Sequence, residues 1–249
     1  RTAMVVAFSK GTQCGLSAFS GFSADPFYLR PVGVDADSAA ALQANYFMQR
    51  SGATPYDFAG VAAKNRACGA KNPRAMAGEG GNFTTDQILA SAPIASPITE
   101  LQAGRVGDGA VVLILATEEF VKERKLHASW ITGVGFSKDA YYPTYRDLSR
   151  LRSAEKAAQV ACKMAGVSVD AFDFAEIHEC YAHQELMLYE SLGLCAEGRA
   201  AAFLKDGKTG SGGDIPVNAS GGTLSGNVIY ASGLHRLLEA SLQVKGKAG

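Results

Sequence analysis

The sequence carries no excess charge of either sign and no long apolar run. Its 249 residues include 24 Lys and Arg against 24 Asp and Glu, so the net charge gives no reason to expect a nucleic-acid or anionic-membrane partner. The longest apolar run, residues 110–116, is far shorter than the roughly 18 residues that a membrane span needs. At 47% hydrophobic residues, the chain is too apolar for disorder. The composition therefore predicts a globular protein of one or two domains, without nucleic-acid or membrane partners.

Paired cysteines are also missing. The five cysteines are widely spaced, and none forms a C-x-x-C pair: Cys14, Cys68, Cys162, Cys180 and Cys195. This spacing excludes a zinc ribbon and a thioredoxin-like motif, and reduced thiols predict a cytoplasmic location. No signal peptide is visible, and the chain enters an apolar run directly after Arg1. Because domains rarely begin inside an element, we expect a further segment upstream.

The hydrophobic pattern predicts strands that alternate with helices. Strands are expected at residues 3–8, 110–116, 130–136, 174–177 and 215–218. Helices are expected at residues 38–50, 54–65, 117–125, 153–165, 181–192 and 229–244. The runs at 3–8 and 110–116 do not alternate with polar residues, which is typical of strands buried on both faces. The order predicts an α/β fold whose helices pack on largely buried sheets.

One candidate site lies where the strand at 174–177 meets the helix at 181–192, in E-I-H-E-C-Y. Ligands of open α/β sheets bind at such strand ends. The positive end of the helix is expected to lower the pKa of the Cys180 thiol, and His178 can exchange protons with a carbonyl substrate. A buried cysteine and a hydrogen-bonded core histidine are the alternative interpretation. His183 completes H-E-x-x-x-H, which lacks the metal-binding H-E-x-x-H spacing, so no metal is expected.

A second candidate site follows the strand at 215–218, in N-A-S-G-G-T-L-S-G-N, residues 218–227. Ser220, Gly221 and Gly222 allow the backbone to approach a ligand closely and to direct N–H groups at an oxyanion. An ordinary glycine-rich turn explains the same residues. The loop matches neither G-x-G-x-x-G nor a P-loop.

Four segments, taken in order, resemble the thiolase superfamily, in the branch of the thiolase part of sterol carrier protein X and of bacterial and archaeal acetyl-CoA acetyltransferase-like proteins. Residues 64–75 read K-N-R-A-C-G-A-K-N-P-R-A, similar to that branch's K-N-H-x-x-A-x-x-N-P-x-A. Residues 108–116 read D-G-A-V-V-L-I-L-A, similar to D-G-A-A-A-V-I-L-A. H-E-C-Y at 178–181 resembles H-D-C-F, and I-P-V-N-A-S-G-G at 215–222 resembles I-P-V-N-P-S-G-G. The resemblance covers nearly the whole chain.

The resemblance implies a thiolase fold, a layered αβαβα architecture built from two similar halves. Residues 1–126 would be the remainder of the N-terminal half, with a loop insertion, and residues 127–249 the C-terminal half. The nucleophile motif and the family's last strands are absent from this sequence, so we expect either that they lie beyond it or that the chain is a natural partial subunit. The resemblance also implies a homodimer or larger assembly, and a small zinc-ribbon/OB-fold partner protein.

The resemblance further implies acyl-CoA chemistry, with coenzyme A as a substrate and no permanently bound cofactor. An upstream cysteine would attack the ketone carbon of a 3-oxoacyl-CoA. Cys180 would be the acid/base, and His178 would help to form an oxyanion site. The substrate and CoA would contact Tyr181, Ser220, Gly221, Gly222 and Tyr230.

Two departures shape the functional hypotheses. The family's G-H-P-x-G-A-T-G appears as G-N-V-I-Y-A-S-G at residues 226–233. Asn227 therefore replaces a catalytic histidine; its amide can donate to an oxyanion but cannot act as a base. Tyr230 replaces a glycine and would reshape the acyl pocket.

The leading hypothesis is a thiolase for a specialised 3-oxoacyl-CoA, for example one with a bulky or aromatic acyl group. The alternatives are a retro-aldolase acting on a 3-hydroxyacyl-CoA and a non-catalytic scaffold subunit.

Overall fold

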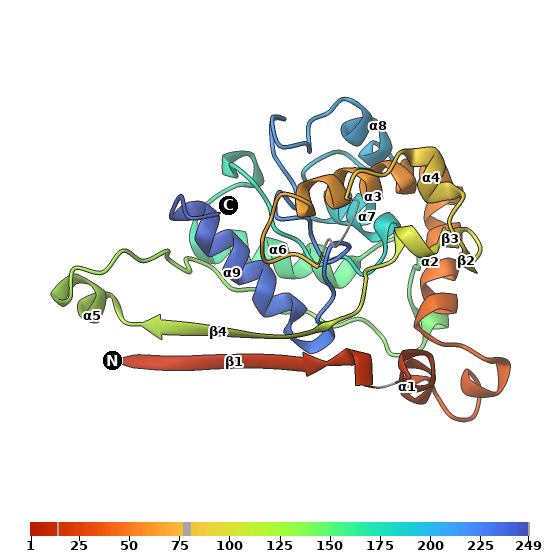
Figure 1. Cartoon of the computed structure of the whole chain (residues 1–249), viewed down its shortest axis with the longest axis horizontal. Helices are drawn as coiled ribbons and strands as arrows, with labels where there is room; N and C mark the ends of the chain where they lie inside the picture. The colour runs from red at the N-terminus through yellow and green to blue at the C-terminus, as the bar shows by residue number, and fades with distance from the viewer. Residues whose placement is uncertain (14, 77–80, 249) are drawn as a thin grey trace.

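Helices are the main regular structure of the computed structural model, which describes residues 1–13, 15–76 and 81–248 (Figure 1). Cys14 lies outside the described residues. The α-helices are α1 (Leu16–Ser23), α2 (Ala36–Ser51), α3 (Pro55–Gly69), α4 (Thr85–Leu89), α5 (Glu118–Glu123), α6 (Arg152–Ala165), α7 (Ala182–Ser191), α8 (Ala200–Lys205) and α9 (Ser232–Val244). The strands are β1 (Thr2–Lys10), β2 (Pro93–Ala95), β3 (Ile98–Thr99) and β4 (Asp108–Ala116). No helix among the described residues is long and apolar enough to cross a membrane.

Helix ends follow the capping signals of the sequence. Helix α3 begins with a capping box in which the Thr54 N–H donates to Asp57 Oδ2 at 2.8 Å, and Pro55 occupies the first turn. Helix α2 ends at Gly52, whose φ of 73° is left-handed. Gly166 ends α6 in the same way, with a φ of 68°. The predicted helices are confirmed, whereas α1 and α8 lie in stretches without clear periodicity.

The main core lies between α2, α3 and α7. Phe47 of α2 and Phe58 of α3 are fully buried, with ring centroids 6.4 Å apart. Leu186 and Tyr189 of α7 complete this layer without solvent exposure. The core therefore rests on helix packing, and it holds the N-terminal end of α7 in place beside the candidate site.

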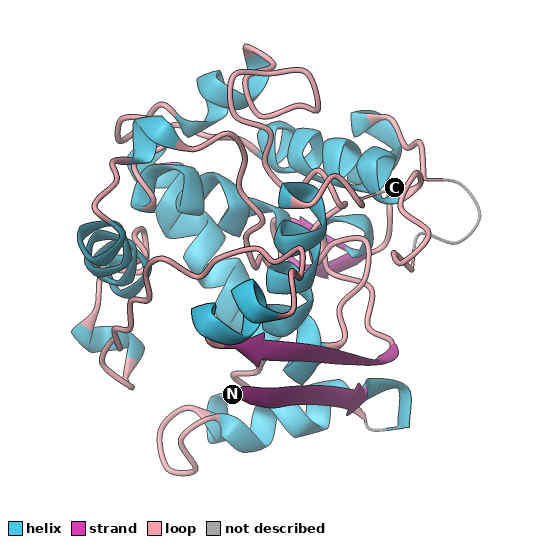
Figure 2. Ribbon diagram, turned by 90° about the vertical axis from the view of Figure 1, so that its left-hand side faces the viewer, coloured by secondary structure: helices cyan, strands magenta, loops and turns pink. Residues whose placement is uncertain are grey.

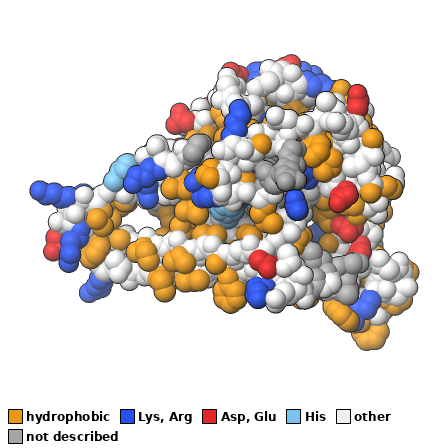
Figure 3. All heavy atoms as spheres, in the orientation of Figure 1, with side chains coloured by type: hydrophobic (Ala, Val, Ile, Leu, Met, Phe, Trp, Pro, Cys, Tyr) orange, Lys and Arg blue, Asp and Glu red, His pale blue; other side chains and the backbone are white. Residues whose placement is uncertain are grey.

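The long two-stranded sheet corrects the prediction of buried strands. β1 and β4 pair antiparallel, from Thr2 opposite Ala116 to Lys10 opposite Asp108 (Figures 1 and 2). Yet Met4 is 68% exposed, Phe8 70% and Ile114 64%, and apolar side chains line this edge of the molecule (Figure 3). Among the described residues each strand pairs only with the other, and α9 packs on part of β4. The apolar runs at 3–8 and 110–116 correctly predicted strands. The burial of their side chains, however, depends on whether other layers of the structure cover the sheet.

Three other predicted strands are wrong or reduced. The apolar segment 130–136 forms no strand, because it packs directly on the backbone of α6. A methyl group on Gly133 would lie 2.1 Å from the Ala161 carbonyl oxygen, and one on Gly135 would lie 1.8 Å from that of Ala157. The segments 174–177 and 215–218 meet in a single parallel bridge, Ala175 to Val217. Beyond this bridge the two segments do not continue as paired strands.

Candidate functional site

The bridge between Ala175 and Val217 brings the two predicted clusters to one edge. The Asn218 N–H donates to the Ala175 carbonyl at 2.8 Å, and the Ile177 N–H donates to Asn218 Oδ1 at 2.8 Å. Asn218 has a φ of 55°, a conformation that asparagine tolerates better than most residues. This residue therefore turns the chain out of the bridge and into the glycine-rich loop.

A buried polar group lies beneath this junction, which we call the carboxylate centre: Asn65, Glu179, Glu185 and Asn218. Asn218 Nδ2 donates to Glu179 Oε2 at 2.9 Å and to Glu185 Oε2 at 2.8 Å. Asn65 Nδ2 donates to the same two side chains, at 3.1 and 2.6 Å. All four side chains are essentially inaccessible to solvent. Two amides thus hold two carboxyl groups together within the core.

The charge of the carboxylate centre is balanced in two ways. Lys64 Nζ lies 2.8 Å from Glu185 Oε1 and donates to the Val217 carbonyl. Burial, and next the nearby charge of Glu185, raise the pKa of Glu179 to about 8. Glu179 is therefore protonated over most of the neutral range. Sequence reasoning considered Glu179 only as part of the H-E-C-Y motif and of the H-E-x-x-x-H spacing. It missed Asn65 and Glu185, although the K-N pair at 64–65 belongs to a matched motif.

The glycine-rich loop closes over the carboxylate centre at a distance that only glycine permits. Gly222 has a φ of +62°, and a methyl group there would lie 2.2 Å from Glu179 Oε1. Gly221 has a φ of +100°, and its added methyl would lie 2.5 Å from the Cα of Gly69 in α3. Both glycines are buried. Their position is consistent with the predicted close approach, but the partners that the structure shows are protein groups.

Ser220 anchors the same loop to α9. Its N–H and hydroxyl donate to Glu176, at 3.0 and 2.6 Å. Arg236 Nη1 lies 2.9 Å from Glu176 Oε2 and 2.6 Å from Ser220 Oγ. Ser220 therefore holds the loop in place within a buried ion-pair network.

Cys180 and His178 lie at the predicted strand end, but the expected pKa of the thiol is wrong in direction. Burial, followed by the charge of Glu179, raises the pKa of Cys180 to about 11. The Cys180 N–H donates to Gln184 Oε1 at 3.0 Å, and α7 begins only at Ala182. Desolvation outweighs the helix dipole here, so the thiol is protonated. Burial and then the Arg236 charge lower the pKa of His178, which leaves a neutral imidazole.

A segment that sequence reasoning missed joins Cys180 to Asn227. The Gly104 N–H donates to the Cys180 carbonyl at 2.8 Å, and the Asn227 N–H donates to the Arg105 carbonyl at 2.8 Å. A methyl group on Gly104 would lie 3.2 Å from Asn227 Cβ. We call residues 103–107 the crossing segment, because they run between the two motifs. In the sequence this segment reads A-G-R-V-G. It matches none of the family motifs and directly precedes the D-G-A motif.

Asn227 presents its amide nitrogen as a free donor. Its Oδ1 accepts from the Ile229 N–H and from the Ser232 hydroxyl, both at 2.9 Å. The backbone donor fixes which atom is oxygen, so Nδ2 points the other way and has no partner among the described residues. This arrangement supports oxyanion binding and excludes a base. Nearby, Tyr230 is 66% exposed and meets Phe19 edge to face, with 6.2 Å between ring centroids.

Tyr181 and His183, the other two aromatic residues near the first motif, form hydrogen-bond contacts with side chains of the protein. The Tyr181 hydroxyl donates to Asp37 Oδ1 at 2.6 Å. His183 is 1% exposed, contacts Gln43 at 3.2 Å, and its pKa falls to about 3 through burial. It is therefore a neutral core residue. Within the described ranges, no group of three or more His, Cys, Asp or Glu side chains is arranged to hold a metal ion.

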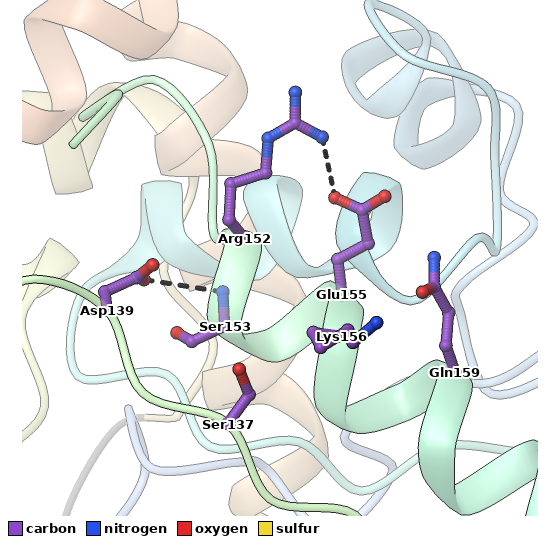
Figure 4. Close-up of a pocket in the computed structure, with 7 residues that line it drawn as sticks. All are labelled: Ser137, Asp139, Arg152, Ser153, Glu155, Lys156 and Gln159. Carbon is purple, nitrogen blue, oxygen red and sulfur yellow. Dashed lines mark hydrogen bonds and ion pairs between the residues drawn. The ribbon is translucent and has the colours of Figure 1, made fainter.

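A separate cavity of about 390 Å³ lies at the start of α6 (Figure 4). Its lining is polar and of mixed charge: Ser137, Asp139, Arg152, Ser153, Glu155, Lys156 and Gln159. Arg152 pairs with Glu155 at 2.8 Å, and Asp139 accepts from the Ser153 N–H at 3.4 Å. None of the predicted site residues lines this cavity, which belongs to the surface of α6.

Known proteins share sequence and fold with this chain. Residues 136–249 match the family described as Thiolase C-terminal domain-like. The chain is 33% identical over 209 residues to Sterol carrier protein 2 of Gallus gallus, covering 81% of this chain and 38% of that protein. It is 30% identical over 207 residues to Benzoylsuccinyl-CoA thiolase subunit BbsB of Thauera aromatica, covering 82% and 53%. The structure matches the Ltp2-ChsH2(DUF35) aldolase with a TM-score of 0.83 at 25% identity, covering 98% of this chain and 65% of that one.

Residues 136–249 thus belong to the thiolase C-terminal domain-like family, and the chain has thiolase-superfamily homologues and the thiolase fold. It spans about half, or less, of the length of these two curated relatives. The fold class and the resemblance predicted from the motifs are confirmed. The division at residues 126 and 127 and the roles of individual site residues stay predictions.

Proposed function

We propose that the protein acts on coenzyme A thioesters, as a thiolase that cleaves or forms a carbon–carbon bond in a 3-oxoacyl-CoA. The observation that carries this proposal is the crossing segment, whose backbone bonds to Cys180 and to Asn227 and so brings the thiol residue and the free amide donor together. An acid beside an oxyanion donor is what cleavage next to a thioester carbonyl requires.

In this proposal each group has one role. A cysteine outside this sequence attacks the ketone carbon, the bond between C2 and C3 breaks, and the acyl group stays on that cysteine. The departing enolate takes the proton of Cys180. Asn227 Nδ2 and the neutral His178 donate hydrogen bonds to the oxyanions. Cys180 then accepts the proton of the incoming CoA thiol, which removes the acyl group.

The aromatic pair of Phe19 and Tyr230 supports a bulky or aromatic acyl group. The two rings stand 6.2 Å apart on the exposed side of residues 226–233. The name of the Thauera relative specifies benzoylsuccinyl-CoA, a substrate with an aromatic ring. We therefore expect the acyl pocket to accept a planar ring.

A retro-aldolase is the second candidate. Asn227 offers no base to activate a cysteine nucleophile, and the structural match to an aldolase is strong, with a TM-score of 0.83. That reaction breaks the corresponding bond of a 3-hydroxyacyl-CoA and needs no acyl-enzyme. A partner subunit is also part of the proposal, because the matched aldolase combines two named components and the Thauera relative is called a subunit.

Intact-mass spectrometry of the complete protein separates the two reactions. After incubation with acetyl-CoA or benzoyl-CoA, a thiolase gains the mass of one acyl group and loses it when free CoA is added. A protein that binds these esters without any adduct, and that cleaves a 3-hydroxyacyl-CoA, is an aldolase.

Substitution at Cys180 tests the acid/base role. Cys180→Ala is expected to lower turnover by about 10³-fold, in the range of general acid–base catalysis, while acyl-enzyme still forms from acetyl-CoA. Cys162→Ala on α6 is the matched control and keeps normal turnover. Unchanged turnover in Cys180→Ala would remove the proposed role, and a complete protein without any turnover would indicate a scaffold.

A further inference from the structure

We propose that Glu179 is a positioning residue for the proposed reaction, and that the reach of its side chain sets the spacing between Cys180 and Asn227. This inference rests on the proposed function, because it assigns a further role at the same site. Glu179 is 0% exposed and lies within the carboxylate centre. It therefore acts through the groups that it holds, and not by contact with the substrate.

Glu179 holds the glycine-rich loop that leads to Asn227 at two points. Its Oε2 accepts from Asn218 Nδ2 at 2.9 Å, at the start of the loop. Its Oε1 accepts from the Leu224 N–H at 3.2 Å. Leu224 lies in the tight turn that directly precedes Asn227, and a backbone hydrogen bond of 3.1 Å closes this turn. The carboxyl group of Glu179 therefore fixes the place at which the loop delivers Asn227.

The crossing segment completes a ring of hydrogen bonds around the same residues. The Gly104 N–H donates to the Cys180 carbonyl at 2.8 Å, and the Asn227 N–H donates to the Arg105 carbonyl at 2.8 Å. Because Glu179 directly precedes Cys180 in the chain, these bonds return to the residue that holds the loop. We call this arrangement the positioning ring, and it consists of three short segments: residues 104–105, 179–180 and 224–227. Two of the hydrogen bonds that join the segments are between backbone groups, and the third is made by the side chain of Glu179.

The positioning ring is closely packed. A methyl group on Gly104 would lie 3.2 Å from Asn227 Cβ and 3.3 Å from the Cys180 carbonyl oxygen. On the other side of the loop, a methyl group on Gly222 would lie 2.2 Å from Glu179 Oε1. Protein packing of this density transmits a displacement and does not absorb it. A shift of the Glu179 carboxyl group therefore changes the spacing of Cys180 and Asn227.

The length of the side chain at position 179 matters more than its charge in this arrangement. The raised pKa of Glu179, about 8, leaves the carboxyl group uncharged over most of the neutral range. An aspartate would withdraw the carboxyl group by one carbon–carbon bond, about 1.5 Å. Misplacement of reacting groups by about 1 Å can cost about 10²-fold in rate.

The test compares two variants that separate reach from acidity. Glu179→Gln keeps the length and an oxygen that can accept from the Leu224 N–H, whereas Glu179→Asp keeps the acid and loses the length. Turnover of acetoacetyl-CoA, benzoylacetyl-CoA and 3-hydroxybutyryl-CoA is measured with the complete protein, at a temperature where urea unfolding shows each variant to be folded. We expect Glu179→Gln to keep kcat within about threefold of the native value, and Glu179→Asp to lower it at least about tenfold. KM should stay within about twofold in both, because the lost effect concerns the transition state.

Tyr189→Phe is the matched control for stability. It removes a buried hydroxyl that donates to Glu185 in the carboxylate centre, but Tyr189 is not part of the positioning ring. This variant should be less stable and keep the native kcat. An equal fall of kcat in Tyr189→Phe and Glu179→Asp would make the effect one of stability and overturn the inference.

Two further outcomes would also overturn it. A Glu179→Gln variant as slow as Glu179→Asp would show that the acid matters, and native kcat in Glu179→Asp would show that the reach does not. If the Glu179 variants do not fold, Gly104→Ala tests the positioning ring from its other side. It should lower kcat about fivefold, while Gly212→Ala, whose methyl meets nothing within 4 Å, keeps it; native kcat in Gly104→Ala would overturn the inference. A native protein that cleaves none of the three esters contradicts the proposed function itself, and this inference with it.

Discussion

The carboxylate centre and the ribbon of β1 and β4 show opposite relations between residue type and burial. In the carboxylate centre, two amides and two acids lie fully inside the protein. In the ribbon, Met4, Val6, Phe8 and Ile114 lie largely outside. Buried polar groups are costly unless they are hydrogen-bonded. In the centre every enclosed side-chain oxygen and nitrogen except Asn65 Oδ1 has a partner, so its stability depends on specific geometry. The ribbon needs only backbone pairing, and its side chains tolerate change.

The comparison predicts that isosteric changes in the carboxylate centre have the largest effect. Asn218→Asp replaces the Nδ2 donor, shared by Glu179 and Glu185, with an oxygen of a third carboxyl group. We expect a loss of about 3–5 kcal/mol in the free energy of unfolding, typical of an uncompensated buried charge. Urea unfolding measures this loss.

The control for that change is Asn45→Asp. Asn45 is exposed, and its Nδ2 donates to the carbonyls of Ala41 and Ser96 at 2.8 and 3.2 Å. Its loss should stay below about 1 kcal/mol, the net value of an ordinary hydrogen bond. Equal losses for the two variants would mean that the centre is hydrated in solution.

Gly222→Ala should have the next largest effect. Its φ of +62° disfavours a side chain, and the added methyl would lie 2.2 Å from Glu179 Oε1. Strain and overlap together predict a loss of about 3 kcal/mol. Gly212→Ala is the matched control, since nothing lies within 4 Å of its added methyl. Thermal unfolding measures the stability of both variants. A Gly222→Ala variant as stable as the native protein would contradict the close approach of the loop to Glu179.

Glu179→Gln should change how stability depends on pH. The folded pKa of Glu179 is raised from 4.5 to about 8, so between these values the folded state holds a proton that the unfolded state has lost. Stability therefore falls as pH rises through this window, by at most about 1.4 kcal/mol per pH unit. The uncharged glutamine should remove this slope. Urea unfolding at several pH values between 5 and 8.5 measures it, and identical slopes for both proteins would count against the shift.

The smallest effects are expected in the ribbon, where two neighbouring valines of β4 give a direct contrast. Val111 is 6% exposed and packs near Val228, whereas Val112 is 51% exposed. Val111→Thr should cost about 1–2 kcal/mol, because it buries a hydroxyl without a partner. Val112→Thr should change stability by less than about 0.5 kcal/mol. If Val112→Thr costs as much as Val111→Thr in the complete protein, the outer face of the ribbon is covered there.

Local signals in the sequence predicted much of the helical structure. The Thr54 and Asp57 capping pair and the glycines at 52 and 166 mark helix ends through interactions within a few residues. The segment 130–136 was a wrong prediction, because an apolar run is compatible with a strand and with extended chain lying on a helix. Which one forms depends on Gly133 and Gly135 meeting α6, a contact between parts distant in sequence.

For the candidate site, residue type and spacing were enough to find the two motifs and to place each one after a predicted strand. The resemblance to the family added the exchange of a histidine for Asn227. The raised pKa values of Cys180 and Glu179 could be found only from the folded chain, since both depend on burial and on charges brought together by folding. Folding also placed the crossing segment beside Cys180. Desolvation and long-range contacts have no local signature, and for that reason these features appear only in the folded molecule.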